Sequence, residues 1–364
     1  NIMQRKIKLF DPIFDSKEEK TLKNVLWSHN WASGSGVGTV SKFEKKFQKY
    51  VGSDSCVAVN SGTAALHLAL SNYNIKNKEV ILPSLSFVST AHAIIMNGGK
   101  PIFVDVDPKT LCLDVEQLSK SITKKTKAVL PVHFGGYPCD MDKILQISKE
   151  NKLILIEDAA HAVGTSYKEK KIGSHGHAVC FSFHPVKNLA MPGGGLISIN
   201  DKAHKKLTKN LHAKRWCGIT NRKGPIYDVK ELGFTYYMNE FSSSIGLIQL
   251  KKLEKMNNMR KKISQIYHKK LNLEKKIPMN NNCSYHLFWI QVKNRKNFMN
   301  NMSKKGIETG IHYIPIHKMT MYSSAKSLPE TEHASKNLVS IPCHPNLTSN
   351  DIEHIVTNVN KFSE

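Results

Sequence analysis

Residues 180–200, CFSFHPVKNLAMPGGGLISIN, contain two short apolar runs separated by a loop. The loop carries one lysine, Lys187, and three consecutive glycines, Gly193–Gly195. Short, continuous apolar runs are typical of strands that are buried on both faces of a sheet. The stretch therefore predicts two buried strands, and it places a cation and a length of bare backbone between them.

Runs of the same kind recur through the first two hundred residues. The seven runs span residues 56–62, 79–84, 101–107, 128–136, 153–160, 178–184 and 195–200. Helical patterns lie between several of them, for example at 63–72 and 140–152. Repeated alternation of strand and helix predicts an α/β fold with a mostly parallel sheet.

The pattern changes from about residue 240. Apolar residues at helical spacing over 241–271 predict one long helix or two joined helices. The expected elements that follow are a strand at 285–292, a helix at 297–310, a strand at 311–317 and a terminal helix capped by Thr348 or Ser349. We therefore expect a large α/β domain at 1–244 and a smaller α+β domain at 245–364.

The composition narrows the class of protein. No run of about 18 apolar residues is present, so we expect no membrane span. The first residues lack the apolar core of a signal peptide. The seven cysteines are odd in number and form no C-x-x-C pair, which indicates reduced thiols and a cytoplasmic location.

The formal net charge of +24 raises the alternative of a basic regulatory or nucleic-acid-binding protein. The cations, however, are almost all lysines, whereas nucleic-acid readers favour arginine for paired contacts to bases and phosphates. The arginines are Arg5, Arg215, Arg222, Arg260 and Arg295. We expect no nucleic-acid partner, and a basic surface also suits phosphorylated metabolites.

Ligands of open parallel sheets bind beyond the carboxyl ends of the strands. Gly62 and Thr63 follow the first strand and begin a helix, where free amides could hold a phosphate; an ordinary turn capped by Thr63 is the alternative. Asp158 ends a buried strand and needs a partner, either a protonated ring nitrogen or an ordinary salt bridge. Lys187 is either a nucleophile for a carbonyl or a solvated lysine.

Taken together, these groups fit pyridoxal 5′-phosphate (PLP), which needs a phosphate site, a carboxylate for its ring nitrogen and a lysine. Phe87 could stack on the ring, His161 could lie beside it, and Ser182 could bind the phosphate. The glycines would then let the backbone pass close to Lys187. We expect no metal, because His175 and His177 lack further ligands at suitable spacing.

The chain resembles the DegT/DnrJ/EryC1/StrS family of PLP-dependent nucleotide-sugar aminotransferases. The matching segments, in family order, are 31–52, 58–70, 81–107, 130–136, 156–198, 232–250, 305–317 and 340–348. The resemblance implies PLP fold type I, which is aspartate aminotransferase-like, with a mostly parallel seven-stranded sheet and a smaller C-terminal α+β domain. It also implies a homodimer with shared active sites.

The resemblance also implies residue roles. Lys187 matches the lysine that forms a Schiff base with PLP, and Asp158 matches the partner of the pyridine nitrogen. His161 matches the residue beside the ring hydroxyl, and Phe87 matches the stacking aromatic. The phosphate cradle is matched by Gly62, Thr63, Ala64 and Ser182, and the segment that meets the nucleotide-sugar by Tyr313 and His317.

One loop departs from the family pattern. Where G-Y-N-Y-R is common, this chain has Gly233-Phe234-Thr235-Tyr236-Tyr237. Thr235 is shorter than asparagine and Tyr237 removes a cation, at a loop that usually reaches the partner's PLP phosphate. In contrast, Lys187 occupies the position where family members that dehydrate the sugar carry histidine, which favours amino transfer.

The sequence thus predicts an enzyme that moves an amino group from an amino acid to a nucleotide-linked keto-deoxysugar, at C3 or C4. L-Glutamate is the favoured donor. The alternatives are another PLP enzyme on the same scaffold, such as a sugar 3-dehydratase or a cyclitol transaminase, and the basic non-enzymatic protein.

Overall fold

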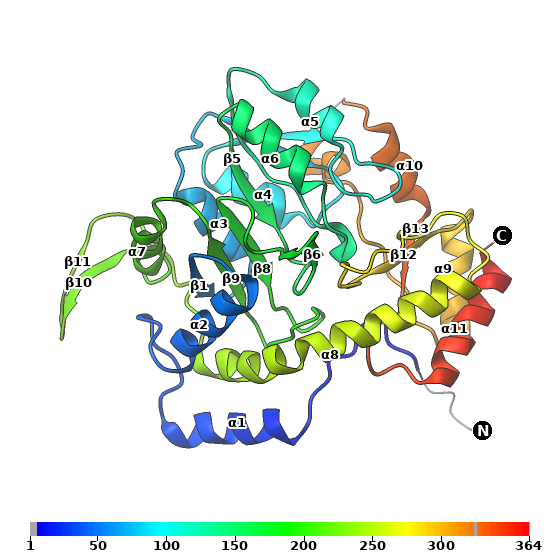
Figure 1. Ribbon diagram of the computed structural model, residues 1–364, viewed down its shortest axis with the longest axis horizontal. Helices are drawn as coiled ribbons and strands as arrows, with labels where there is room; N and C mark the ends of the chain where they lie inside the picture. Colours follow the sequence, from blue (N-terminus) through cyan, green and yellow to red (C-terminus); the bar gives the residue numbers. More distant parts are fainter. Residues whose placement is uncertain (1–5, 324–325, 364) are drawn as a thin grey trace.

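A seven-stranded sheet forms the centre of the protein in a computed structural model, which describes residues 6–323 and 326–363 (Figure 1). Its strands are β1 (Ser55–Val59), β2 (Glu79–Pro83), β3 (Lys100–Val104), β4 (Thr126–Val129), β5 (Ile154–Asp158), β8 (Ala178–Ser182) and β9 (Gly195–Ile199). They lie in the order β1-β9-β8-β5-β4-β2-β3. Within this sheet β9 runs antiparallel to both of its neighbours, β1 and β8, and all other neighbouring pairs are parallel. The predicted seven-stranded, mostly parallel sheet is confirmed.

Helices cover both faces of this sheet. They are α2 (Thr39–Val51), α3 (Gly62–Ser71), α4 (Ser89–Met96), α5 (Val115–Ser121), α6 (Met141–Glu150) and α7 (His204–Lys214). Helix α1 (Ser16–Ser28) instead packs on the long helix described below. Successive residues of β1 belong to different cores: Val57 and Val59 pack with Leu68 of α3, whereas Ala58 packs with Phe43 of α2. Burial on both faces explains why the strands are continuously apolar.

Several short elements lie outside the large sheet. They are the 3₁₀ turn η1 (Phe134–Gly136) and two hairpins, β6 (Ser166–Tyr167) with β7 (Lys170–Lys171), and β10 (Ile219–Lys223) with β11 (Ile226–Val229). The β10–β11 hairpin extends away from the rest of the molecule (Figure 1). Most of its side chains, including the apolar Ile226, Tyr227 and Val229, are exposed.

The region from 240 to 270 is one continuous helix, α8 (Glu240–Lys270), begun by the side chain of Asn239, which accepts from the Ser242 amide. It runs from α1 and α2 to the C-terminal elements (Figure 1). Those elements are β12 (Phe288–Gln291), α9 (Arg295–Lys304), η2 (Ile316–Lys318), η3 (Thr320–Tyr322), α10 (Pro329–Asn337), β13 (Leu338–Ile341) and α11 (Ser349–Phe362). The proposed domain boundary between residues 244 and 245 lies inside α8.

The helices and the first strand predicted for the C-terminal region are present, although the helix predicted at 297–310 ends at Lys304. Thr348 caps α11 and forms a capping box with Asp351. The strand expected at 311–317 is wrong, because its backbone bonds elsewhere: the amide of Ile316 donates to the carbonyl of Ser84, at 2.9 Å, and the segment ends in η2. Pro315, which has no N–H, also cannot serve as a donor in a strand ladder.

No helix in the described part of the chain is long and apolar enough to cross a membrane. The seven cysteines are free thiols. Six of them are buried, as expected of core-filling residues, and only Cys217 is exposed.

Candidate active site

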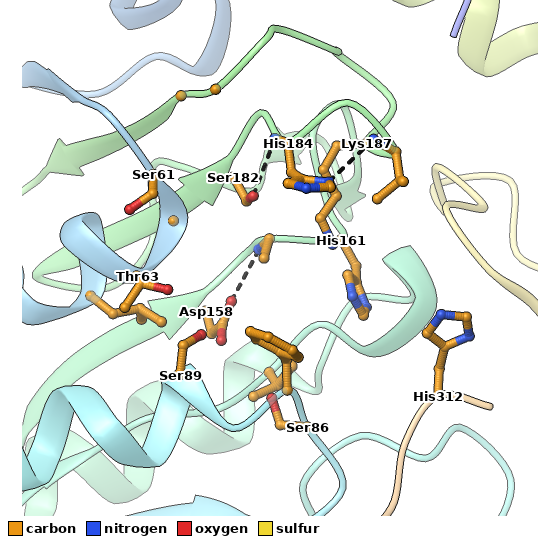
Figure 2. Close-up of a pocket in the computed structure, with 18 of the residues that line it drawn as sticks. Ser61, Thr63, Ser86, Ser89, Asp158, His161, Ser182, His184, Lys187 and His312 are labelled. Atoms are coloured by element: carbon orange, nitrogen blue, oxygen red, sulfur yellow. Dashed lines mark hydrogen bonds between the residues drawn. The ribbon is translucent and has the colours of Figure 1, made fainter. Parts of the chain in front are cut away.

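One cavity of about 420 Å³ lies beyond the carboxyl ends of β1, β2, β5 and β8, where the sequence placed the polar residues. Figure 2 shows Ser61, Thr63 and Ser182 around one part of it and His161 and His312 around another. The predicted residues on its wall are Gly62, Thr63, Phe87, Asp158, His161, Ser182, Lys187 and Tyr313. The sheet edge therefore brings together groups that are far apart in sequence.

Asp158 ends β5 and is buried. One carboxylate oxygen accepts from the Ala160 amide at 3.1 Å, and the other accepts from the Thr90 hydroxyl at 2.8 Å. Burial raises the pKa of Asp158, and these two donors and the nearby Lys187 oppose that shift. In the described part of the chain, Asp158 makes no ion pair, so a cationic ring nitrogen would supply the missing partner.

The start of α3 forms a second part of the wall. Ser61 caps the helix by accepting from the Ala64 amide at 3.0 Å, so the cap is Ser61 and not Thr63. The amides of Gly62 and Thr63, in the first turn of α3, have no protein acceptor in the described residues, as is usual at a helix N-terminus. A Cβ on Gly62 would lie 2.8 Å from the Cβ of Ser182. This close approach leaves two free amides beside a serine, which suits a phosphate.

The three glycines after Lys187 have different neighbours. A Cβ on Gly195 would lie 2.2 Å from the carbonyl oxygen of Ser61, and one on Gly194 would lie 2.7 Å from the sulfur of Met191. Gly193 and Gly194 line the cavity. Gly195 therefore lets β9 pass the start of α3. That Gly193 and Gly194 let the backbone pass close to Lys187 stays a prediction.

Lys187 lies on the loop between β8 and β9 and is half-buried. Burial lowers its pKa to about 8, against the opposing charge of Asp158. Its Nζ lies 3.4 Å from Nε2 of His286. An amine with this pKa exchanges its proton readily near neutral pH.

His161 and Tyr313 form a bonded pair on the same wall. Nδ1 of His161 accepts from the Gly135 amide at 3.2 Å, so Nε2 carries the proton and donates to the Tyr313 hydroxyl at 2.9 Å. The phenolic proton of Tyr313 is then free for a ligand. Phe87, 56% exposed, lies with its ring centroid 6.0 Å from that of Tyr313, and is available to stack on a ring.

Four residues with predicted or suspected roles do not reach this cavity. Ala64 is buried and gives its amide to the helix cap. His317 is buried outside the cavity, where it contacts Ser84 and Glu332. Thr235 is exposed and Tyr237 is half-buried, and neither lines the cavity.

Sequence reasoning missed several contributors, among them His312 on the cavity wall. Thr90 holds Asp158, and Ser86, on the cavity wall, lies 2.8 Å from the Thr90 hydroxyl. Because Thr90 donates to Asp158, it accepts from Ser86. The hydroxyls around Phe87 carried a usable signal, since they follow β2 at the same sheet edge. His286 carried none, because it precedes a strand of the C-terminal region.

The residues present fit PLP. The cavity offers two free amides and a serine for a phosphate, a buried carboxylate without a cation, an exposed aromatic face and a lysine with a lowered pKa. No group of three His, Cys, Asp or Glu side chains in the described residues could hold a metal ion. Fold and cavity thus define a PLP-dependent enzyme.

Comparisons with known proteins agree. Residues 12–360 match the model of the DegT/DnrJ/EryC1/StrS aminotransferase family. The spore coat polysaccharide biosynthesis protein SpsC of Bacillus subtilis is 35% identical over 95% of this chain and 94% of its own. GDP-perosamine synthase of Escherichia coli O157:H7 is 32% identical over 98% of both chains. PseC of Helicobacter pylori, an aminotransferase involved in the biosynthesis of pseudoaminic acid, superposes with a TM-score of 0.93, at 26% identity over 99% of both chains.

The chain therefore belongs to the DegT/DnrJ/EryC1/StrS aminotransferase family. It is a PLP-dependent sugar aminotransferase with the predicted aspartate aminotransferase-like fold. The alternative of a non-enzymatic basic protein is thereby excluded.

Proposed function

We propose that the enzyme transfers the amino group of an amino acid, with L-glutamate the favoured donor, to C3 or C4 of a nucleotide-linked keto-deoxysugar. The observation that carries this proposal is the cavity that joins Lys187, Asp158 and the free amides of α3. The similarity to GDP-perosamine synthase supports a nucleotide-linked acceptor. Lysine at position 187 favours amino transfer over dehydration.

PLP, when bound, supplies an electron sink for the carbon atom that loses a proton. Lys187 moves that proton: with a pKa of about 8, its amine can accept and return a proton at a similar free-energy cost. Asp158 holds a proton on the ring nitrogen, and the donors Thr90 and Ala160 favour its ionised form.

The other residues on the cavity wall bind the cofactor and orient the substrate. The amides of Gly62 and Thr63 and the hydroxyl of Ser182 hold the phosphate. Phe87 covers one ring face, and His161 keeps the Tyr313 hydroxyl directed at the substrate side. His317 does not line the cavity, and its ring nitrogens contact Ser84 and Glu332, so we assign it the role of holding the segment that follows Tyr313.

We further propose a homodimer that completes the site. The β10–β11 hairpin and the residues after it expose apolar side chains, with Ile226 73% and Leu232 79% exposed. Thr235 and Tyr237 follow this hairpin and do not reach the cavity of their own chain, which leaves them for a second copy. Sedimentation of the purified enzyme should give twice the chain mass of 41.0 kDa, and a monomer would contradict this part.

The test of the main proposal is the variant Lys187→Ala, with Lys205→Ala, which removes an exposed lysine of α7, as the control. Borohydride should fix PLP to the wild-type peptide that contains Lys187, as located by mass spectrometry. With L-glutamate and a nucleotide-linked keto-sugar, the wild type and the control should release 2-oxoglutarate and give a product with a new amine. Turnover by Lys187→Ala, or a product that has instead lost water, would overturn the proposal.

A further inference from the structure

His286 is a buried histidine that the reaction described above does not use. It is 3% exposed and lies just before β12. Its Nε2 lies 3.4 Å from Nζ of Lys187, and its Nδ1 is buried with no hydrogen-bond partner in the described residues. Its ring stacks on Phe10 and lies 4.6 Å from the ring of His161, centroid to centroid. A buried ring nitrogen without a partner is costly, which calls for a reason.

The side chain of Asn188 holds together the two chain segments that carry Lys187 and His286. The side-chain amide of Asn188, next to Lys187, donates to the carbonyl of Ser284 at 2.9 Å and to the side chain of Asn257 on α8 at 2.9 Å. Asn188 is itself buried. The loop that carries Lys187 is therefore hydrogen-bonded to Ser284, which lies two residues before His286 in the chain.

We propose that His286 is a positioning residue, which holds the amine of Lys187 through Nε2 whenever that amine is not bonded to the cofactor. This inference rests on the function proposed for Lys187. During transfer the amine must leave the cofactor, stay within reach of the substrate carbon and return. A contact 3.4 Å away, on a different chain segment, keeps it in the cavity.

A neutral acceptor suits this task better than a carboxylate. Burial and the positive charges nearby hold the pKa of His286 well below its usual range, so the ring is neutral at physiological pH. The titratable groups that face the pair are Asp158, His161, Arg260, His312 and the lysine itself. A second carboxylate beside Lys187 would stabilise its ammonium form and hold the proton that the reaction must move, whereas an imidazole orients the amine at less cost.

The first experiment measures the pKa of the Lys187 amine directly, in full-length protein from which PLP has been removed. Acetic anhydride labels the free amine, and peptide mass spectrometry follows labelling of Lys187 against pH. If the ammonium form of Lys187 loses a hydrogen-bond acceptor, the pKa of Lys187 falls. We therefore expect His286→Phe, which keeps the ring and its stacking, to shift the labelling midpoint to lower pH, and His286→Gln, which restores an acceptor, to reverse most of this shift.

The matched control is His268→Phe. His268 lies near the end of α8, is half-buried, and also has a ring nitrogen, Nε2, without a partner in the described residues. It packs on Phe288, away from the cavity. This variant should leave the midpoint unchanged.

The second experiment uses the PLP-loaded enzyme and the first half-reaction with L-glutamate. We expect His286→Phe to slow the single-turnover rate about 100-fold, the cost of a misplaced reacting group, at unchanged PLP content and unchanged KM. The inference is overturned if His286→Phe leaves both the labelling midpoint of Lys187 and the single-turnover rate at their wild-type values. It is also overturned if His286→Phe and His286→Gln slow the reaction equally and both lose PLP. Failure of borohydride to fix PLP at Lys187 would instead defeat the proposed function itself.

Discussion

Thr90 offers a sharp test of how the protein holds Asp158. Its hydroxyl is buried and donates to one carboxylate oxygen at 2.8 Å, while Ser86 lies behind it at 2.8 Å. Thr90→Val removes this donor and nearly keeps the shape of the side chain. A hydrogen bond to a charged group contributes about 1.5–3 kcal/mol. If Asp158 must be ionised to hold the ring-nitrogen proton, the first half-reaction should slow about tenfold to a hundredfold.

Thr90→Val should also shift the pH dependence of the rate in a defined direction. The Thr90 hydroxyl lowers the pKa of Asp158, against the burial that raises it. Without the hydroxyl this pKa rises, so the carboxylate becomes protonated at a higher pH. The acid limb of the pH–rate profile should therefore move to higher pH in Thr90→Val.

The assay is the single-turnover rate with L-glutamate across pH, alongside PLP content and thermal unfolding. Thr90→Ser keeps the hydroxyl and should recover most of the rate and the position of the acid limb. A folded, PLP-loaded Thr90→Val enzyme with the wild-type rate and an unmoved acid limb would refute the reasoning about Asp158.

Two further predictions concern packing and thiol chemistry. Gly195→Ala places a methyl group 2.2 Å from the Ser61 carbonyl oxygen, so it should destabilise the protein by about 1–3 kcal/mol and weaken PLP binding. Urea unfolding checks this, with Gly193→Ala, whose nearest neighbour is 3.6 Å away, as a control that should match the wild type; equal stability of the two variants would contradict it. Cys217 is the exposed thiol, while burial raises the pKa of Cys56 to about 12, so a thiol reagent should modify one cysteine quickly and Cys217→Ser should abolish that phase; rapid modification in this variant would contradict it.

The sheet could be predicted because its signal is local. Each strand is a short run buried on both faces and bounded by turn residues, and the position of a polar side chain after a strand is enough to place it at the carboxyl edge. Asp158, Lys187 and Thr63 were found in this way. Each lies directly at or soon after a strand end, so no knowledge of tertiary contacts was needed.

The rest depends on contacts between distant segments. Thr90 meets Asp158 across 68 positions, and Lys187 meets His286 across 99, and no local pattern records such pairs. Residues 311–317 alternate like a strand, yet tertiary bonds to Ser84 set their conformation. The glycines at 193–195 were noticed, but the sequence does not show that Gly195 lies against Ser61.

The two ends of the loop that carries Lys187 are paired with each other. Ser182 and Gly195 face each other in adjacent antiparallel strands, and the Phe183 amide donates to the Gly194 carbonyl at 2.9 Å. Inside the loop, Leu189 and Met191 are buried. The entropy of ordering this loop is thus lost when the chain folds, and not when the cofactor arrives. PLP meets a binding surface already in shape, so little of its binding energy is spent on rearranging the protein.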